Sequence, residues 1–163
     1  MKYLKISVGI FIALAASRFF PHPPNFTSLL ALSFYIPALF GRKHILSIII
    51  CFMLTDLIIG FHTTTLFTWG SVAIIGYFSH YFLKSISTRL FGVFSATFIF
   101  FIVSNFGVWM SSILHGNYDL NLLETYFIAI PFYGNTLIST IVFSLIIEGL
   151  ISFKKVKTIL KKI

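Results

Sequence analysis

The stretch SRFFPHPPNFTSLLAL, residues 17–32, separates the first two apolar segments of the chain and decides how they are connected. Its three prolines fix backbone angles and remove amide donors, so a helix cannot continue through them. Arg18, His22 and Asn25 are unfavourable in hydrocarbon but are tolerated at a membrane surface. We therefore predict a short surface loop here, with Asn25 capping the N-terminus of the next helix.

Composition indicates a protein that lies in a lipid bilayer. Of 163 residues, 58% are hydrophobic and 10% are charged, and the 21 phenylalanines exceed what a water-soluble domain of this size can bury. We therefore expect an integral membrane protein. The net charge of +8 does not indicate a nucleic-acid partner, because the basic residues occur in short runs between apolar blocks.

Apolar blocks between polar breaks predict an all-α, polytopic membrane protein, a single domain over residues 1–163 with six transmembrane helices. The expected helices are about 4–20, 26–40, 45–60, 65–83, 89–112 and 131–153, with an outer amphipathic segment at about 120–130 and Pro131 starting the sixth helix. The second and third span roughly 23 Å, short of about 30 Å of hydrocarbon, so a re-entrant hairpin is the alternative. Arg42 and Lys43 at the intervening turn favour full crossings, since cations avoid hydrocarbon.

The distribution of lysine and arginine predicts the orientation. When the N-terminus, the loops at 41–44 and 84–89 and the C-terminal tail are assigned to the cytoplasm, every such residue except Arg18 lies inside. The positive-inside rule therefore predicts that both termini are cytoplasmic. A secretory signal peptide is the alternative interpretation of the first segment. The basic tail after residue 153 is typical of an anchor to the anionic inner leaflet.

Polar residues from separate helices fall at the outer side in this topology. Inside a bilayer such groups face a bundle interior or a water-filled cavity, so we predict an outward-facing polar pocket. The candidate ligand-binding residues are Arg18, His22, Asn25, Asp56, His62, Asn105, Trp109 and Asn135. Ordinary interpretations stay open: Asp56 pairs with Arg18, Asn105 hydrogen-bonds between helices, and Trp109 belongs to an interfacial belt.

Two ladders with i, i+4 spacing run along the first and last helices. Gly9, Ala13 and Ser17 let another helix approach closely, either within the protein or in a partner subunit. The second ladder consists of Thr136, Thr140, Ser144 and Glu148. Its hydroxyls suit either an ion or proton path or helix packing that ends in a carboxylate near the inner lysines.

Signatures of catalysis are missing from the sequence. There is no G-x-S-x-G elbow, H-E-x-x-H motif or glycine-rich phosphate loop, and the five histidines share no ligand spacing. We therefore expect no enzyme activity, no catalytic residue, no metal site and no cofactor. Cys51 and His62 would share one face if the third helix continued, offering ligands to a metal-containing cofactor. The ordinary interpretation of Cys51 is a buried apolar residue.

Four motifs of the chain resemble those of a protein family. The opening stretch, LTDLIIGFHTTTLFTWGS at 54–71, SNFGVWM at 104–110 and IPFYGNTLIST at 130–140 resemble, in order and spacing, an uncharacterised family of small bacterial membrane proteins. The layout is also similar to the substrate-binding S components of energy-coupling-factor vitamin transporters. This likeness implies an S-component-like bundle in the bacterial inner membrane.

The likeness to S components also implies a function. A vitamin-like small molecule would be captured in the outer pocket, with a cobalamin-type ligand as one candidate and His62 or Cys51 as its cobalt ligand. The face of Gly9, Ala13 and Ser17 would dock on a membrane coupling subunit driven by separate ATPases. Two other hypotheses stay open: a structural or assembly protein without a ligand, and an ion- or proton-conducting protein.

Overall fold

The computed structural model describes residues 2–116 and 121–153, which form six α-helices and no strand. The helices are α1 (Lys2–Phe19), α2 (Leu29–Phe40), α3 (Ile45–Ile59), α4 (Thr65–Phe78), α5 (Ile86–Leu114) and α6 (Leu122–Ser152). Short 3-10 helices follow α2 and α4, η1 at Arg42–His44 and η2 at Ser79–Phe82. The predicted all-α fold with six helices is confirmed for these residues. The predicted C-terminal anchor lies outside them.

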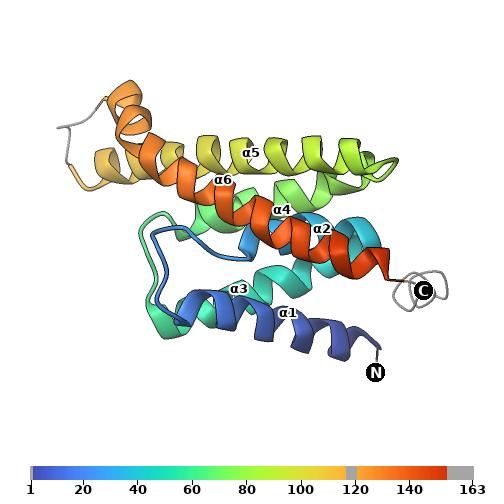
Figure 1. The fold of residues 1–163 in the computed structure, drawn as a ribbon. Helices are drawn as coiled ribbons and strands as arrows, with labels where there is room; N and C mark the ends of the chain where they lie inside the picture. Colours follow the sequence, from blue (N-terminus) through green and yellow to red (C-terminus); the bar gives the residue numbers. More distant parts are fainter. Residues whose placement is uncertain (1, 117–120, 154–163) are drawn as a thin grey trace.

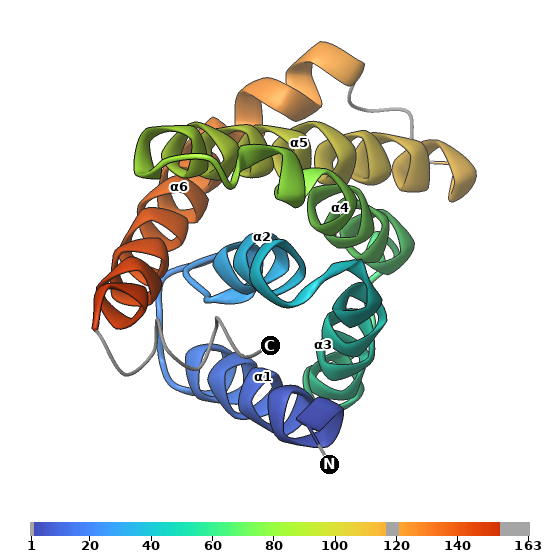
Figure 2. The same cartoon turned by 90° about the vertical axis from the view of Figure 1, so that its right-hand side faces the viewer.

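The helices run back and forth between two ends of the bundle (Figure 1). One end carries the loops at residues 20–28 and 60–64 and is called the proline end. The other, called the terminal end, carries the start of α1, the turns at 41–44 and 83–85 and the last turns of α6. Viewed along the bundle, α2 lies in the centre and the other five helices surround it (Figure 2).

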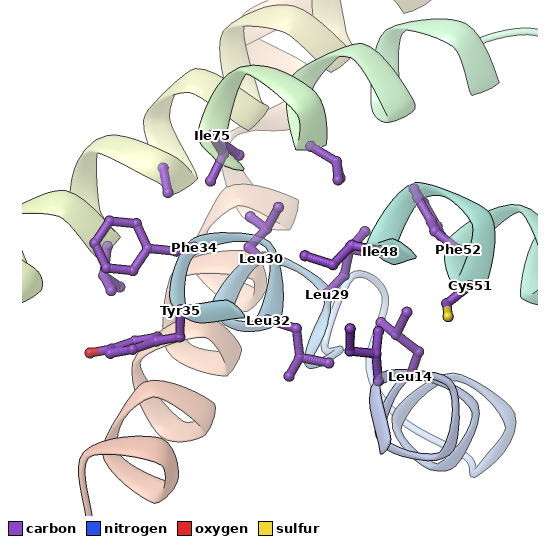
Figure 3. Close-up of a cluster of buried hydrophobic side chains, with 14 residues drawn as sticks. Leu14, Leu29, Leu30, Leu32, Phe34, Tyr35, Ile48, Cys51, Phe52 and Ile75 are labelled. Carbon is purple, nitrogen blue, oxygen red and sulfur yellow. The ribbon is translucent and has the colours of Figure 1, made fainter. Parts of the chain in front are cut away.

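Helix α2 forms the core because it is apolar on every side, as expected of a central helix. Nine of its twelve residues are buried. Its side chains point outward in several directions, toward Leu14 of α1, Ile48 of α3 and Ile75 of α4 (Figure 3). The helix therefore acts as the common packing partner of the bundle.

Two glycines let α5 approach its neighbours closely. A Cβ atom on Gly92 would lie 2.6 Å from the ring of Phe34 in α2, and one on Gly107 would lie 2.4 Å from Cγ of Phe67 in α4. No side chain fits at those distances, so close contact of these helices requires glycine at both positions.

The start of α2 differs from the prediction. Asn25 does not cap the helix, which begins at Leu29 rather than 26; Asn25 instead has φ of 63° in a left-handed turn, a conformation that asparagine tolerates. Ser28 precedes the helix, and its hydroxyl donates to the carbonyl of Ala13 at 3.2 Å and lies 2.8 Å from the hydroxyl of Ser17. The loop is thus fastened to α1, and α2 is shorter than expected.

The last helix also differs from the prediction. Pro131 lies inside α6 instead of starting it, and the expected separate amphipathic segment forms the first turns of the same helix. A capping box starts α6. Asn121 Oδ1 accepts from the backbone N–H of Glu124 at 3.0 Å, and the Glu124 carboxylate accepts from the backbone N–H of Asn121 at 2.9 Å. The first turns, orange in Figure 1, run at an angle to the rest, as an internal proline commonly produces.

Helix lengths vary in a way that matters for the site. Both α5 and α6, with 29 and 31 residues, are long and apolar enough to cross a bilayer. By contrast α2 has 12 residues, roughly 18 Å of helix. Because α2 starts only at Leu29, residues 20–28 form a loop at the proline end. The loop leaves space above the first turn of α2 for polar side chains.

Candidate functional site

A cavity with two adjoining lobes lies at the proline end, above the first turn of α2. The Arg18 lobe has a volume of about 280 Å³ and the Asn105 lobe one of about 240 Å³. Both lobes are lined by Asn25, His62, Thr68, Phe100 and Thr136. Because these walls are shared, the lobes form one elongated site.

Six of the eight candidate residues line this cavity. Arg18, His22, Asn25, Asp56 and His62 line the Arg18 lobe, while Asn105 lines the other lobe together with Asn25 and His62. They come from α1, α3, α5 and the two loops of the proline end. The structure thus brings together side chains that lie as far as 87 positions apart in the sequence, from Arg18 to Asn105.

An ion pair forms one wall of the Arg18 lobe. Nη1 of Arg18 lies 2.6 Å from Oδ1 of Asp56 and also donates to the hydroxyl of Thr55. The indole of Trp69 donates to Oδ2 of Asp56 at 2.8 Å. The guanidinium lies over the ring of Phe52, 4.7 Å from its centroid. The pairing of Asp56 with Arg18 is therefore present, and the pair lines the cavity.

Asp56 and Arg18 differ in how many of their hydrogen-bonding atoms have a partner. Both oxygens of Asp56 have a partner, whereas all side-chain hydrogen bonds of Arg18 with described residues run through Nη1. The side chains of Arg18 and Asp56 are only 12% and 5% exposed, and both residues line the cavity, so the remaining donors of the guanidinium are reached through the cavity. The pair accordingly offers hydrogen-bond donors to the cavity rather than acceptors.

The two histidines occupy the loops at the cavity mouth. Both ring nitrogens of His22 face backbone carbonyls, with Nδ1 2.7 Å from that of Pro23 and Nε2 3.3 Å from that of Arg18. Thr65 fixes the other loop, because its hydroxyl accepts from the His62 amide at 2.9 Å and donates to the His62 carbonyl at 2.6 Å. The ring of His62 is thereby held at the junction of the lobes.

Trp109 and Asn135 line neither lobe of this cavity, and their role in ligand binding stays a prediction. The ring of Trp109 packs against Phe106, with centroids 5.5 Å apart, and Phe106 in turn contacts Phe67 of α4 at 6.0 Å. This aromatic cluster joins α5 to α4 through Phe106 and Phe67.

That face of α6 contains site residues that sequence reasoning missed. It consists of Ala129, Phe132, Tyr133, Thr136 and Ser139. Their i, i+3, i+4, i+7 spacing is the signature of one helical face and was the available signal. Thr136 was instead assigned to the hydroxyl ladder. Further lining residues include Thr27, Thr65, Thr68 and Phe100, of which the three threonines lie within the first two quoted motifs.

Two threonines of the hydroxyl ladder bond within α6. Thr136 donates to the carbonyl of Phe132 at 2.9 Å, and Thr140 donates to that of Thr136 at 2.6 Å. These two bonds match the packing interpretation, because both hydroxyls are used locally. The buried hydroxyl of Ser144 has no such partner in its own helix.

The carboxylate at the end of the ladder was predicted to meet the inner lysines. The lysines of the C-terminal tail lie outside the described residues, and within the described part of the chain the carboxylate bonds to an arginine and a tyrosine. Glu148 receives Nε and Nη2 of Arg89 at 2.5 and 2.9 Å, and the hydroxyl of Tyr35 at 2.7 Å. Arg89 lies near the start of α5, which begins at Ile86, one turn earlier than expected. The cluster ties α2, α5 and α6 together at the terminal end.

The small-residue ladder of α1 is divided between two environments. Ala13 and Ser17 contact Ser28 within the protein, whereas Gly9 is exposed and a Cβ atom there would meet nothing within 4 Å. Packing inside the chain therefore accounts for two of the three positions, and only Gly9 faces outward.

Cys51 and His62 are not brought together. The thiol of Cys51 is buried and donates to the carbonyl of Ser7 in α1 at 3.4 Å, while His62 lies at the cavity. Figure 3 shows Cys51 on the side of α3 that faces α1. Over the described ranges, 2–116 and 121–153, no group of three or more His, Cys, Asp or Glu residues is placed to hold a metal ion.

Comparison with known proteins finds a relationship at the level of a family. No curated protein and no solved structure matches the chain. A family profile matches residues 2–161, a range that includes all six helices and every residue of the cavity. The chain therefore belongs to DUF6580, a family of unknown function, in agreement with the expected uncharacterised family.

Proposed function

We propose that this protein is a membrane-embedded substrate-binding subunit that crosses the bilayer six times and captures a vitamin-like small molecule at its proline end. The observation that carries the proposal is the cavity itself. Polar side chains from separate helices and loops converge at one end of an otherwise apolar bundle. A concave site with a few convergent polar groups is the usual form of a ligand pocket.

The surface of the bundle supports residence in a bilayer. Large apolar side chains are exposed along the helices, among them Leu66, Phe91, Phe98, Phe127 and Leu145. A water-soluble monomer rarely exposes so much contiguous apolar surface. The turn at 41–44 lies at the terminal end of the bundle rather than halfway along it, which favours full crossings over a re-entrant hairpin.

Charge favours one orientation. The terminal end carries Arg42, Lys43, Lys84 and Arg89, whereas the proline end carries Arg18. By the positive-inside rule we place the terminal end in the cytoplasm of a bacterial inner membrane, with both termini inside. The cavity then opens to the outside, as capture of a nutrient requires.

The volume of the cavity limits the size of the ligand. The two lobes lie at the lower end of the volume range of small-molecule pockets. A cobalamin, with its corrin ring and nucleotide loop, is too large for this space. Cys51 is also unsuited as a cobalt ligand, because it faces α1. The cavity favours a smaller polar molecule.

Uptake by an S-component-like mechanism needs a partner. A membrane coupling subunit driven by separate ATPases would contact the exposed face of α1. That face carries Gly9 beside the exposed side chains of Leu4, Val8 and Ile12. Because Ala13 and Ser17 are used inside the chain, the proposed contact is confined to this part of α1.

Native mass spectrometry of protein purified gently from its own host tests the proposal. We expect a bound small molecule that Asn105→Ala releases and that the matched control Asn135→Ala retains, because only Asn105 lines the cavity. A protein without bound mass, and without stabilisation by any small molecule, would instead favour the structural or assembly role.

A further inference from the structure

We infer that the ligand is an aromatic carboxylic acid that carries an N–H or O–H donor at the end opposite its carboxylate. This inference rests on the proposed function and names the substrate class of the same cavity. It follows from which hydrogen-bonding groups of the cavity wall are already engaged and which are not.

The guanidinium of Arg18 provides the carboxylate subsite. Its Nη1 is engaged by Asp56 and Thr55, whereas Nε and Nη2 form no hydrogen bond with any described residue. The N–H bonds of Nε and Nη2 run parallel along one edge of a guanidinium, and this edge matches the two oxygens of a carboxylate. Because the Arg18 side chain is only 12% exposed, such a bond is stronger than in water.

The charge of the wall disfavours multiply charged ligands. Asp56 neutralises Arg18, so a carboxylate monoanion brings one uncompensated charge into the cavity, whereas a phosphate dianion brings two. A cationic group finds no unpaired carboxylate, since Asp56 is the sole carboxylate among the described lining residues and is already paired with Arg18. A carboxylate fits this wall better than a phosphate or an amine.

The Asn105 lobe provides the site for the ring. Its walls include Phe100, Phe101, Phe132 and Tyr133. Aromatic walls favour a flat aromatic body through stacked or edge-to-face contacts. Because the lobes share walls, a single ligand can place its carboxylate at Arg18 and its ring here.

Asn105 determines the group at the far end of the ring. One N–H of its Nδ2 donates to the carbonyl of Phe101 at 2.8 Å, and its Oδ1 accepts no hydrogen bond from a described residue, so we assign Oδ1 as the acceptor that this lobe offers. An acceptor selects a ligand donor, such as a ring hydroxyl, amino group or ring N–H. The substrate class is therefore a hydroxy-, amino- or N–H-bearing aromatic carboxylic acid.

Thermal stabilisation of the detergent-purified protein by matched probes tests this class. The probes are 4-hydroxybenzoate, 6-hydroxy-2-naphthoate and indole-5-carboxylate, each compared with its amide and with the corresponding aminomethyl compound. We expect the carboxylates to raise the unfolding midpoint and to bind at least about tenfold more tightly than their amides. Equal or tighter binding of the amides or amines would overturn the inference while leaving the proposed function in place.

The remaining outcome separates the two proposals. If no carboxylate stabilises the protein but native mass spectrometry finds another bound molecule, the inference is wrong and the proposed function stands. If neither experiment finds a ligand, both are wrong.

Two variants test the role of Arg18 against a purely structural one. Arg18→Lys retains a cation beside Asp56 but lacks the Nε and Nη2 edge, so carboxylate affinity should fall at least about tenfold while the unfolding midpoint without probe changes little. The double variant Arg18→Gln with Asp56→Asn is neutral and should lose the preference for acid over amide. Asn135→Ala should retain it. Unchanged preference in both Arg18 variants would overturn the inference.

Discussion

The ion pairs at the two ends of the bundle differ in how much of each guanidinium is used. Arg89 at the terminal end donates from Nε and Nη2 to Glu148 and from Nη1 to the carbonyl of Leu83 at 3.4 Å. Arg18 at the proline end bonds to described residues through Nη1 alone. Neither Arg89 nor Glu148 lines the lobes of the cavity, whereas both members of the other pair do.

This difference separates a structural contact from a binding one. A guanidinium whose three nitrogens are all engaged fastens helices and has no capacity for a ligand. One that is paired through a single nitrogen beside a cavity keeps donors for a molecule from outside. Three substitutions sharpen the contrast.

The largest effect is expected from Glu148→Gln. The change leaves the charge of Arg89 without its counterion in a site where the two side chains are 18% and 10% exposed. We expect the free energy of unfolding in detergent to fall by about 3–5 kcal/mol. Combining Arg89→Met with Glu148→Leu should recover most of it, because apolar groups of similar size need no counterion. A loss below about 1 kcal/mol in the single variant would contradict the structural role.

Asp56→Asn should have a smaller effect on the same measurement. Arg18 keeps Thr55 as an acceptor, the new amide oxygen still accepts from Trp69, and the cavity admits water to the guanidinium. We expect a loss of about 1.5–3 kcal/mol, the usual worth of a hydrogen bond to a charged group. A loss equal to that of Glu148→Gln would remove the distinction between the two ends.

Tyr35→Phe should have the smallest effect. It removes one donor to Glu148, while the two bonds from Arg89 remain and the ring keeps its place in the core. We expect the free energy of unfolding to fall by about 1 kcal/mol. Urea or mixed-micelle titrations of wild type and variant would measure it, and a loss as large as that of Glu148→Gln would show that Tyr35 is a principal partner.

The helical class and much of the site could be predicted because apolar runs and costly polar residues are local signals. Arg18, Asp56 and Asn105 were found through the cost of polar groups in an apolar segment, and they do line one cavity. That cost is a property of each residue and needs no knowledge of the neighbouring helix.

The rest depends on how helices rotate against one another, which periodicity within one helix does not specify. Trp109 is on α5 one turn from Asn105, yet contacts with Phe106 hold it outside the cavity. Asn25 met the sequence rule for a cap, but the prolines and the Ser17–Ser28 contact place the start of α2 further along. Pro131 was taken as a start because proline is favoured at the first position of a helix, whereas the capping box at Asn121 starts α6 earlier in the chain.

Cysteine labelling in intact cells tests most directly whether the cavity opens to the outside. In a Cys51→Ser background, which keeps the donor to Ser7, single cysteines replace Thr68 at the cavity or Ser85 in a turn of the terminal end. A membrane-impermeant maleimide should label Thr68→Cys in intact cells and Ser85→Cys only after permeabilisation. Labelling of Ser85→Cys from outside, with Thr68→Cys protected until permeabilisation, would contradict an outward-facing binding site.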